Sequence, residues 1–254
     1  MNERAATYQR EKVIEVNNLH ISFGSQKVLN GISFCLFKGE NLVILGESGT
    51  GKSVLIKCIT ELLIPDEGTI MVLNKNVNAV DQKELASLRK KIGFLFQSGA
   101  LYDSMTVKEN LEFPLLRTKH RIGKQEMEEK VERVLENVGL KHALHKMPAE
   151  LSGGMRKRIA LARTLIVDPE IMLYDEPTTG LDPITSTEIS NLINDVRKKY
   201  HTSSMIITHD MDCAKRVADR IIMLRQGKIY TEGKYEDFEN SNDEWIRAFL
   251  GHEA

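Results

Sequence analysis

The sequence predicts an α/β fold, with an antiparallel β region at its N-terminus and a helical segment inserted into the core. Three observations predict it. Residues 13–37 alternate between apolar and polar side chains and are rich in β-branched and aromatic residues, as antiparallel strands are. Residues 42–45 form an apolar run that ends in a glycine-rich turn, and an apolar-periodic helix follows. From residue 98 to about residue 163 the alternation stops and helical periodicity replaces it.

The length and composition of the chain limit the classes of fold and function that are possible. The chain has 254 residues, enough for one sizeable core with a smaller satellite. Lys and Arg total 35 and Asp and Glu total 36, so the formal charge is −1 and we expect no nucleic-acid partner. No apolar run approaches the roughly 20 residues of a membrane span, and the N-terminus lacks the apolar core and cleavage site of a signal peptide. Three cysteines without motif spacing are expected to be reduced thiols of a cytoplasmic protein: Cys35, Cys58 and Cys213.

The N-terminal region is expected to form two or three antiparallel strands between residues 13 and 37. Phe23 and Gly24 come just before a turn within it. An exposed aromatic ring at this place could stack on a flat base, although an aromatic residue in a strand more often packs in the core. Phe23 is therefore a candidate for base binding that needs support from elsewhere in the chain.

A phosphate-binding loop follows the apolar run. Residues 46–53 match the pattern G-x-x-x-x-G-K-[ST] between a strand and a helix, a match that arises by accident in about one chain in a hundred of this length. Glycines let backbone N–H groups approach phosphate oxygens, and the helix N-terminus adds a partial positive charge. Lys52 is expected to hold the β- and γ-phosphates of a nucleoside triphosphate, and Ser53 to ligate Mg²⁺. The residues expected to bind the nucleotide here are Gly46, Glu47, Ser48, Gly49, Thr50, Gly51, Lys52 and Ser53.

The stretch after the loop leads to a polar side chain at the end of a strand. We expect a strand at 69–73 and a polar helix around 81–90. A short buried strand at 92–96 then ends at Gln97. In the helical segment that follows, the clearest helix has apolar residues at i, i+4, i+7, i+8 and i+11 and a glycine C-cap: Met127, Val131, Val134, Leu135, Val138 and Gly139.

A second anion site is expected where LSGGM, residues 151–155, opens a basic helix. Ser152 offers a hydroxyl, and Gly153 and Gly154 leave the backbone bare at a helix N-terminus. One basic turn in a neutral protein is weak support for nucleic acid. The three basic residues of this turn are interpreted as a solvated face: Arg156, Lys157 and Arg158.

Paired carboxylates end the next buried strand. Residues 171–174 are apolar, and Asp175 and Glu176 follow them. Asp175 suits the shell of Mg²⁺, while Glu176 can reach the attacking water as a base or an orienting group. His209 ends another expected strand, 204–208, from which it can touch a γ-phosphate.

The remaining elements complete the expected α/β order. A tight turn that contains Asp182 precedes a helix at 185–199. The chain is then expected to close with two strands, near 220–224 and 228–231, and a short helix at 245–250.

Five elements now stand in one order: the phosphate loop, Gln97, LSGGM, the strand that ends in Asp175 and Glu176, and His209. In this order they resemble the nucleotide-binding subunit of ATP-binding cassette (ABC) transporters, over about residues 13–235. LSGG ahead of the carboxylate pair distinguishes that family from other phosphate-loop proteins. The resemblance implies a P-loop ABC ATPase core at 13–97 and 164–235, an inserted α-helical subdomain at 98–163, and a short C-terminal helical extension at 236–254.

The resemblance also implies how ATP and Mg²⁺ are bound. Phe23 is similar to the aromatic residue that stacks on adenine, and residues 46–53 to the Walker A loop. Gln97 is similar to the Q-loop glutamine, which senses Mg²⁺ and water. The residues similar to the signature that grips the γ-phosphate of ATP bound to the other protomer are Ser152, Gly153 and Gly154.

The same resemblance implies the catalytic roles. Asp175 is similar to the Walker B aspartate, which ligates Mg²⁺ with Ser53. Glu176 is similar to the catalytic glutamate, His209 to the switch histidine, and Asp182 to the D-loop aspartate. The residues implied to take part in catalysis are Lys52, Gln97, Glu176 and His209.

Small departures from the family pattern help to identify which subfamily of ABC ATPases the chain resembles. Met155 stands where glutamine is usual, Phe23 where tyrosine is usual, and Gly180 where alanine is commoner. None removes a catalytic group, so we expect an active ATPase. The stretches LSGGMRKRIALART and LFQSGALYDSMTVKENLEFPL resemble the ATPases of Mce/Mla-type lipid transport systems, which implies phospholipid or sterol-like cargo.

The resemblance implies partners as well. Two copies would pair head to tail around ATP, and membrane permease subunits would contact the segment between Ser98 and Met105, with Leu101 and Tyr102 exposed. The alternative is that this segment packs on its own helical subdomain. An accessory subunit could brace the C-terminal helix around Trp245. Such a protein would sit in the cytoplasm, on the inner face of the cell membrane.

Other functions within the same family share these motifs. A different ABC importer or exporter would look similar, and so would a regulatory ABC protein that drives a cell-envelope complex without moving cargo. A soluble ABC protein of DNA repair or translation is disfavoured, because those carry a long coiled-coil insertion or two cassettes and this chain has one uninterrupted cassette.

Overall fold

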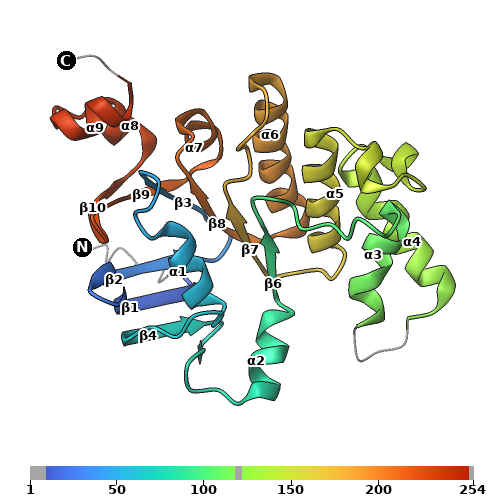
Figure 1. The fold of residues 1–254 in the computed structure, drawn as a ribbon, viewed down its shortest axis with the longest axis horizontal. Helices are drawn as coiled ribbons and strands as arrows, with labels where there is room; N and C mark the ends of the chain where they lie inside the picture. The colour runs from blue at the N-terminus through green and yellow to red at the C-terminus, as the bar shows by residue number, and fades with distance from the viewer. Residues whose placement is uncertain (1–9, 118–121, 252–254) are drawn as a thin grey trace, which may run out of the picture.

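A computed structural model describes residues 10–117 and 122–251. Residues 1–9, most of the N-terminal stretch expected to lack a signal peptide, lie outside the described residues. So do residues 118–121 of the expected helical subdomain and 252–254 of the expected C-terminal extension. The described part is an α/β fold with one antiparallel sheet, one mixed sheet and helices around them, as the sequence predicts (Figure 1). No helix in this part is long and apolar enough to cross a bilayer.

The N-terminal residues form a four-stranded antiparallel sheet in the order β2-β1-β4-β5. The alternation of apolar and polar residues explains why this segment forms a sheet with one buried face. Ile14 and Val16 are fully buried on that face, and Glu15 between them is not. Ile14 pairs with Leu36 of β2 on one side and with Val72 of β4 on the other. The strands are β1 (Lys12–Phe23), β2 (Gln26–Phe37), β4 (Glu67–Val72) and β5 (Lys75–Asn76).

The central sheet has six strands in the order β10-β9-β3-β8-β7-β6, and all neighbours are parallel except β10 and β9. Parallel strands bring their carboxyl ends to one edge: Leu45 pairs with Thr208, and Asp175 with Ile207. The residues that follow β3, β7 and β8 therefore meet at that edge. The strands are β3 (Asn41–Gly46), β6 (Ile92–Leu95), β7 (Ile171–Asp175), β8 (Ser203–Thr208), β9 (Arg220–Arg225) and β10 (Lys228–Gly233).

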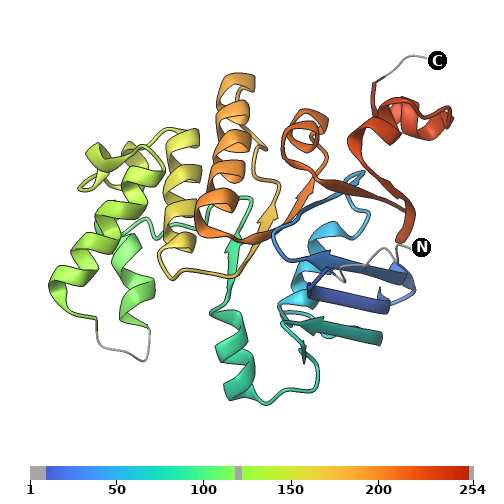
Figure 2. The same ribbon diagram turned by 180° about the vertical axis from the view of Figure 1, so that it is seen from behind.

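Helices cover the sheets and extend the molecule to one side. Figures 1 and 2 show α3 and α4 at the end of the long axis that lies opposite the N-terminal strands. The α-helices are α1 (Lys52–Ile59), α2 (Gln82–Arg89), α3 (Val107–Leu116), α4 (Lys124–Asn137), α5 (Gly153–Leu165), α6 (Pro183–Tyr200), α7 (Met211–Val217), α8 (Tyr235–Glu239) and α9 (Glu244–Phe249). Two 3₁₀ turns connect α4 to α5, at Lys141–Ala143 and Pro148–Glu150.

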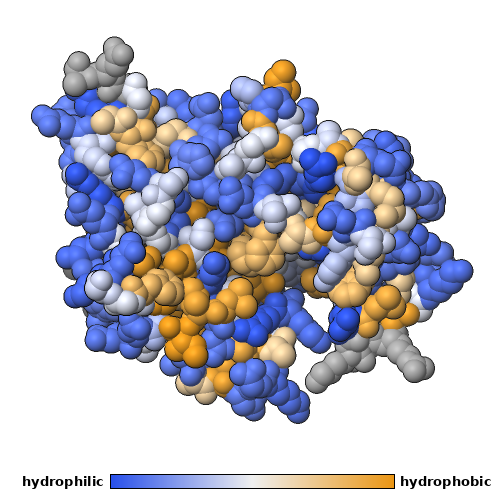
Figure 3. All heavy atoms as spheres, viewed as in Figure 1, coloured by the Kyte–Doolittle hydropathy of each residue, from blue (hydrophilic) through white to orange (hydrophobic). Residues whose placement is uncertain are grey.

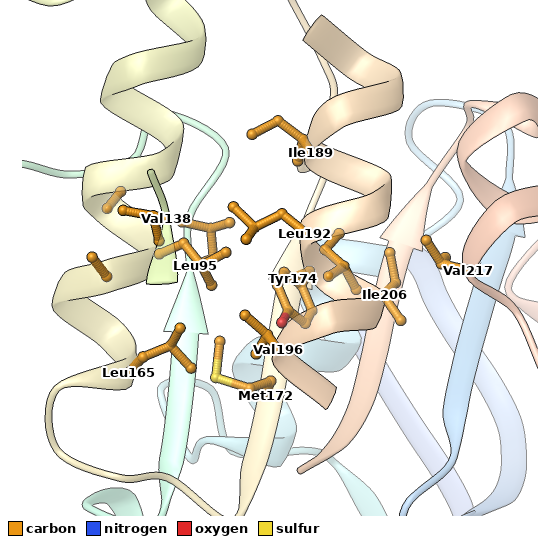
Figure 4. Packing of buried hydrophobic residues seen from close by; sticks show 14 of the residues in the cluster. Leu95, Val138, Leu165, Met172, Tyr174, Ile189, Leu192, Val196, Ile206 and Val217 are labelled. Carbon is orange, nitrogen blue, oxygen red and sulfur yellow. The ribbon is translucent and has the colours of Figure 1, made fainter. Parts of the chain in front are cut away.

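Each face of the central sheet packs in its own hydrophobic cluster. Val43 and Leu45 of β3 belong to the cluster that also holds α5, α6 and α7, whereas Leu42 and Ile44 belong to the cluster that holds α1 and the N-terminal sheet. Both faces of β3 are buried, so it reads as a continuous apolar run. Figure 4 shows the first cluster, in which Tyr174 of β7 lies among side chains of α6.

Three details predicted from the sequence are wrong. Phe96 is 39% exposed rather than buried, because β6 ends at Leu95 and Phe96 begins the next turn. Leu101 is partly buried and packs against the cluster that holds α5, α6 and α7, so it is not an exposed apolar residue. Lys157 is only 7% exposed and does not share the solvated face expected for the basic turn of α5, because it lies on the same side of the helix as the buried Ala160 and Leu161.

Candidate functional site

The phosphate loop connects the end of β3 to the first turn of α1. Gly51, the residue before α1, has φ +94°, and a Cβ there would lie 2.7 Å from Cδ2 of Leu29. Only glycine fits this position, since the conformation is left-handed and the space is already filled. The loop is braced by Thr50, whose hydroxyl donates a hydrogen bond to the carbonyl of Glu47 at 2.8 Å.

Lys52 points back into the loop that precedes it. Its Nζ donates to the carbonyl oxygens of Gly46 at 2.7 Å and Glu47 at 2.9 Å, and the residue is 6% exposed. Burial lowers the pKa of Lys52, and the carboxylates of Glu176 and Asp175 oppose that shift. An ammonium held inside the loop suits the binding of phosphate, because an anion there would supply a full counter-charge that two carbonyls do not.

A hydroxyl from helix α1 and a carboxylate from strand β7 meet beside the loop. The Ser53 hydroxyl donates to Oδ1 of Asp175 at 3.1 Å. Burial raises the pKa of Asp175, while the bond from Ser53 lowers it. A hydroxyl and one carboxylate fit Mg²⁺, which keeps several waters and takes its other ligands from substrate phosphates. When bound, Mg²⁺ would supply positive charge for the phosphate oxygens at this point.

Glu176 lies in a network of donors at the ends of β7 and β8. Its Oε1 is 2.9 Å from Nδ1 of His209. Its Oε2 accepts hydrogen bonds from the hydroxyls of Thr208 and Thr179, both at 3.2 Å. The backbone of Glu176 is left-handed, with φ +50°, and its N–H donates to the carbonyl of Ile207 at 2.9 Å. This network fixes one carboxylate beside the phosphate loop, where it can orient a water.

Neither threonine is among the site residues predicted from the sequence. Thr208 is the last residue of β8, and its predecessor Ile207 pairs with Asp175. The position of Thr208, a hydroxyl residue at the carboxyl end of a strand, is a sequence signal that could have identified it as a partner of the carboxylate pair. Thr179 lies three residues after Glu176 in a turn whose shape the sequence does not specify.

The remaining predicted residues occupy three different places. Phe23 ends β1 at the hairpin turn and is 50% exposed, so its ring is accessible. Gln97 is exposed and directly follows Phe96 at the carboxyl end of β6, which pairs in parallel with β7. Asp182 caps α6: its carboxylate accepts from the N–H groups of Ile184 and Thr185 and from the Thr185 hydroxyl. These bonds, chiefly those from Thr185, hold the pKa of Asp182 below its usual value.

The structure does not bring the LSGG residues to the phosphate loop. Ser152 caps α5, its hydroxyl accepting from the N–H of Met155 at 3.2 Å. Gly153 and Gly154 form the first turn of α5, and a Cβ on Gly154 would lie 2.4 Å from Cγ2 of Thr185 in α6. The helices α1 and α5 pack in different clusters, on opposite faces of the sheet, and Figures 1 and 2 show them apart.

A phosphate loop, a hydroxyl–carboxylate pair that fits Mg²⁺, and a held glutamate at one sheet edge define a class of nucleoside-triphosphate hydrolases. The family model described as ABC transporter matches residues 29–179, more than half of the chain. The chain therefore belongs to the ABC transporter family, as its motifs predict, and it is an ATPase whose hydrolysis is coupled to transport. Members of this family bind ATP with Mg²⁺.

Three curated relatives show the range of the family around this chain. Protein TRIGALACTOSYLDIACYLGLYCEROL 3, chloroplastic, of Arabidopsis thaliana is 38% identical, over 97% of this chain and 76% of its own length. Methionine import ATP-binding protein MetN of Lactobacillus johnsonii is 37% identical, over 94% of this chain and 69% of its own. Probable ribonucleotide transport ATP-binding protein mkl of Mycobacterium tuberculosis is 40% identical, over 93% of this chain and 66% of its own.

Solved cassettes share the fold. The ATP-binding cassette MJ0796, a dimer bound to ADP and Pi, has a TM-score of 0.79 and 30% identity, over 87% of this chain and 98% of its own. The cassette cbiO1 of Clostridium perfringens, part of the ABC transporter complex cbiONQ, has a TM-score of 0.83 and 27% identity, over 96% of this chain and 100% of its own. Cassettes of this family dimerise and act with membrane permease subunits.

Proposed function

We propose that this chain is the nucleotide-binding subunit of a Mce/Mla-type ABC transporter that moves a phospholipid or a sterol-like lipid. The observation that carries the proposal is the 38% identity, over 97% of the chain, to an Arabidopsis protein named after a galactosyl lipid. The stretches at 95–115 and 151–164, which resemble lipid-transport ATPases, support it. The alternative is an ABC ATPase for a polar cargo, since relatives named for methionine and ribonucleotides are about as similar. A regulatory ABC protein that moves no cargo is the second alternative.

The cargo is tested on the intact complex. Purified from membranes with its permease subunits, the complex is expected to carry one lipid class enriched over the bulk membrane extract, identified by mass spectrometry. That lipid should also stimulate its ATP hydrolysis in nanodiscs. An unrelated transporter purified in the same detergent is the control. Stimulation by methionine or a ribonucleotide, with no lipid enriched, would contradict the lipid assignment.

The contacts at the site support specific roles in binding ATP. Lys52 holds the β- and γ-phosphates, after exchanging its two loop carbonyls for phosphate oxygens. Residues 46–53 offer backbone N–H groups to the phosphates, and Phe23 stacks on the adenine ring. Ser53 and Asp175 are proposed as ligands of Mg²⁺, joined by Gln97 once ATP is bound.

The attacking water is proposed to be held by Glu176. Its carboxylate, fixed by Thr208, Thr179 and His209, accepts a hydrogen bond from the water and takes up its proton as the water attacks. His209 has half of its side chain exposed, so it can also reach the γ-phosphate. Lys52 stabilises the charge that gathers on the departing phosphate oxygens.

The groups that enclose the γ-phosphate, here called the cage, are proposed to come from two copies of the chain. One copy supplies the phosphate loop, and the other supplies the LSGG signature. Ser152, Gly153 and Gly154 lie on the opposite face of the sheet from α1, so they cannot close over the loop of their own protomer. In a head-to-tail homodimer each signature turn would meet the other copy's γ-phosphate, with Asp182 nearby. The helix N-terminus would then offer N–H groups to that phosphate.

Residues 98–105 are proposed to contact the permease subunits. Buried Asn110 fixes this loop, accepting from the N–H of Tyr102 at 2.8 Å and donating to the carbonyls of Tyr102, Met105 and Thr106. Tyr102 is 44% exposed, and its ring packs against that of Phe113 at an angle of 57°, with ring centroids 4.8 Å apart. An ordered loop that exposes an aromatic side chain suits docking.

An apolar area lies on the same side of the molecule as the start of that loop. Figure 3 shows apolar side chains gathered over the end of α1 and the strands beside it. Leu62 and Ile64, just after α1, and Phe96, at the end of β6, are exposed large apolar residues. We include them in the proposed permease surface. We also propose that the chain sits on the cytoplasmic face of the membrane.

The C-terminal helices are proposed to receive an accessory subunit. Trp245 of α9 packs edge-on against Tyr230 of β10, with ring centroids 5.0 Å apart, and Arg225 lies over both rings. Tyr230 is partly exposed, and its hydroxyl donates to Asp243. A rigid aromatic and arginine surface is the composition that protein interfaces favour.

A further inference from the structure

Lys157 is a buried cation in α5, the helix that begins at the LSGG signature and is called the signature helix below. It has no part in the roles given above. Lys157 lies in the second turn of α5, and the residue is only 7% exposed. A buried charge persists only where fixed partners compensate it, so the partners of Lys157 show what it does.

Both partners are backbone carbonyls of residues that follow the carboxyl ends of β6 and β7. The Nζ of Lys157 donates to the carbonyl of Gln97 and, at 3.3 Å, to the carbonyl of Glu176. Burial lowers the pKa of Lys157, and the carboxylates of Asp175 and Glu176 oppose that shift. The ammonium thus joins three elements of the chain: α5, the turn after β6, and the end of β7.

Both contact points lie in turns of the backbone. Glu176 has φ +50°, a conformation that residues with a side chain rarely adopt, and its carbonyl accepts from Lys157 and from the N–H of Thr179. Gln97 belongs to a turn closed by the N–H of Gly99 and the carbonyl of Phe96 at 2.9 Å. Gly99 itself lies against α5, since a Cβ there would be 3.3 Å from the Cβ of Ala160.

We propose that Lys157 is a positioning residue for ATP hydrolysis: its ammonium sets the backbone of Glu176 and of Gln97 from the signature helix, so that the glutamate and the glutamine are placed together. A movement of α5 would then shift both groups at once. This inference rests on the proposed role of Glu176 in holding the attacking water.

The test separates positioning from folding. Lys157→Met keeps the length of the side chain and removes every donor. We expect kcat to fall about 10- to 100-fold, the cost of small misplacements near a reacting centre, with the Kd for ATP within about threefold of wild type. Lys157→Gln, which keeps an uncharged donor, should recover part of kcat. Lys198→Met, at an exposed lysine of α6, is the matched control and should hydrolyse ATP normally.

A double-variant cycle shows whether Lys157 acts through Glu176. In the Glu176→Gln background, single-turnover hydrolysis of labelled ATP should fall by much less than in the wild-type background when Lys157→Met is added, because one of the two groups that Lys157 positions is already lost. An equal fall in both backgrounds, loss of ATP binding, or failure of both Lys157 variants to fold would assign a purely structural role and overturn the inference.

The same data keep the two proposals apart. Loss of turnover in Glu176→Gln together with normal turnover in Lys157→Met would overturn the inference alone. Normal turnover in Glu176→Gln would overturn the role proposed for the glutamate, and the inference with it.

Discussion

Among single residues, Glu176 combines backbone strain with a fully engaged carboxylate. Its left-handed backbone is of the kind that costs about 1–3 kcal/mol and persists only where the surroundings enforce it. Two threonine hydroxyls and His209 hold the carboxylate. This arrangement stabilises one orientation of the side chain before ATP arrives, which is the condition for placing a water without rearrangement during the reaction.

Glu176→Gln tests that reading, since it keeps the shape of the side chain and removes its charge. We expect kcat to fall about 10²- to 10⁴-fold, as for loss of a general base, while the Kd for ATP changes little. Phosphate release gives kcat, and size exclusion with ATP and Mg²⁺ should show a trapped dimer. Glu170→Gln, at an exposed glutamate paired with Lys91 on the surface, is the matched control. Normal turnover in Glu176→Gln would place the base elsewhere.

The loop between β6 and α3 shows how an element can be ordered without regular structure. Thr106 and Glu109 form a capping box that fixes the start of α3, and Asn110 in the first turn binds three carbonyls of the preceding loop. The loop therefore presents Tyr102 from a fixed backbone. Preorganised loops lose little entropy on binding, which favours docking.

Tyr102→Asp tests the proposed permease surface. The introduced charge should weaken docking by about 2 kcal/mol, roughly 30-fold in affinity, because it desolvates poorly at an interface. ATP binding by the isolated subunit should be unchanged, and transport in proteoliposomes should fall. Leu101→Asp is less informative, since Leu101 packs against the core. Leu116→Asp, at an exposed leucine of α3, is the control. Wild-type transport with Tyr102→Asp would remove this loop from the interface.

The sequence predicts the features that depend on neighbouring residues, but it does not predict contacts between residues that are far apart in the chain. The order of strands and helices follows local periodicity, and the phosphate loop follows a pattern confined to residues 46–53. Local patterns give no such information about Lys157, whose partners Gln97 and Glu176 are 60 and 19 residues away. The exposure of Phe96 and the burial of Leu101 were also misjudged, because both depend on where β6 ends and on how the next turn folds back.

On the scale of the whole molecule, the sheet separates the two halves of the predicted cage. The phosphate loop leads into α1 on one face, whereas the signature turn begins α5 on the other. Gly154 packs directly against Thr185, which leaves no room for the signature turn to move toward α6. A single protomer therefore cannot enclose the γ-phosphate from both sides by a local rearrangement. Two-fold symmetry would create two equivalent sites, each with one part from either copy.

Mixing two inactive variants tests this architecture. Lys52→Met removes the cation of the phosphate loop. Ser152→Asp keeps an acceptor that can cap α5 but adds a negative charge where the γ-phosphate of the other copy would lie. Each variant alone should be inactive. When the two are unfolded and refolded together in equal amounts, half of the dimers are mixed and each has one intact site, so roughly a quarter of wild-type activity should return.

The control mixture joins two variants that damage the same half of the site, Lys52→Met and Asp175→Asn. In a mixed dimer of these, both sites lack a phosphate-loop or Mg²⁺-binding group, so activity should stay absent. Recovery in the first mixture alone requires that the loop and the signature of a working site come from different copies. If Ser152→Asp hydrolysed ATP at the wild-type rate, or if neither mixture recovered activity, the signature would not act across the dimer and the nucleotide would have to be enclosed within one chain.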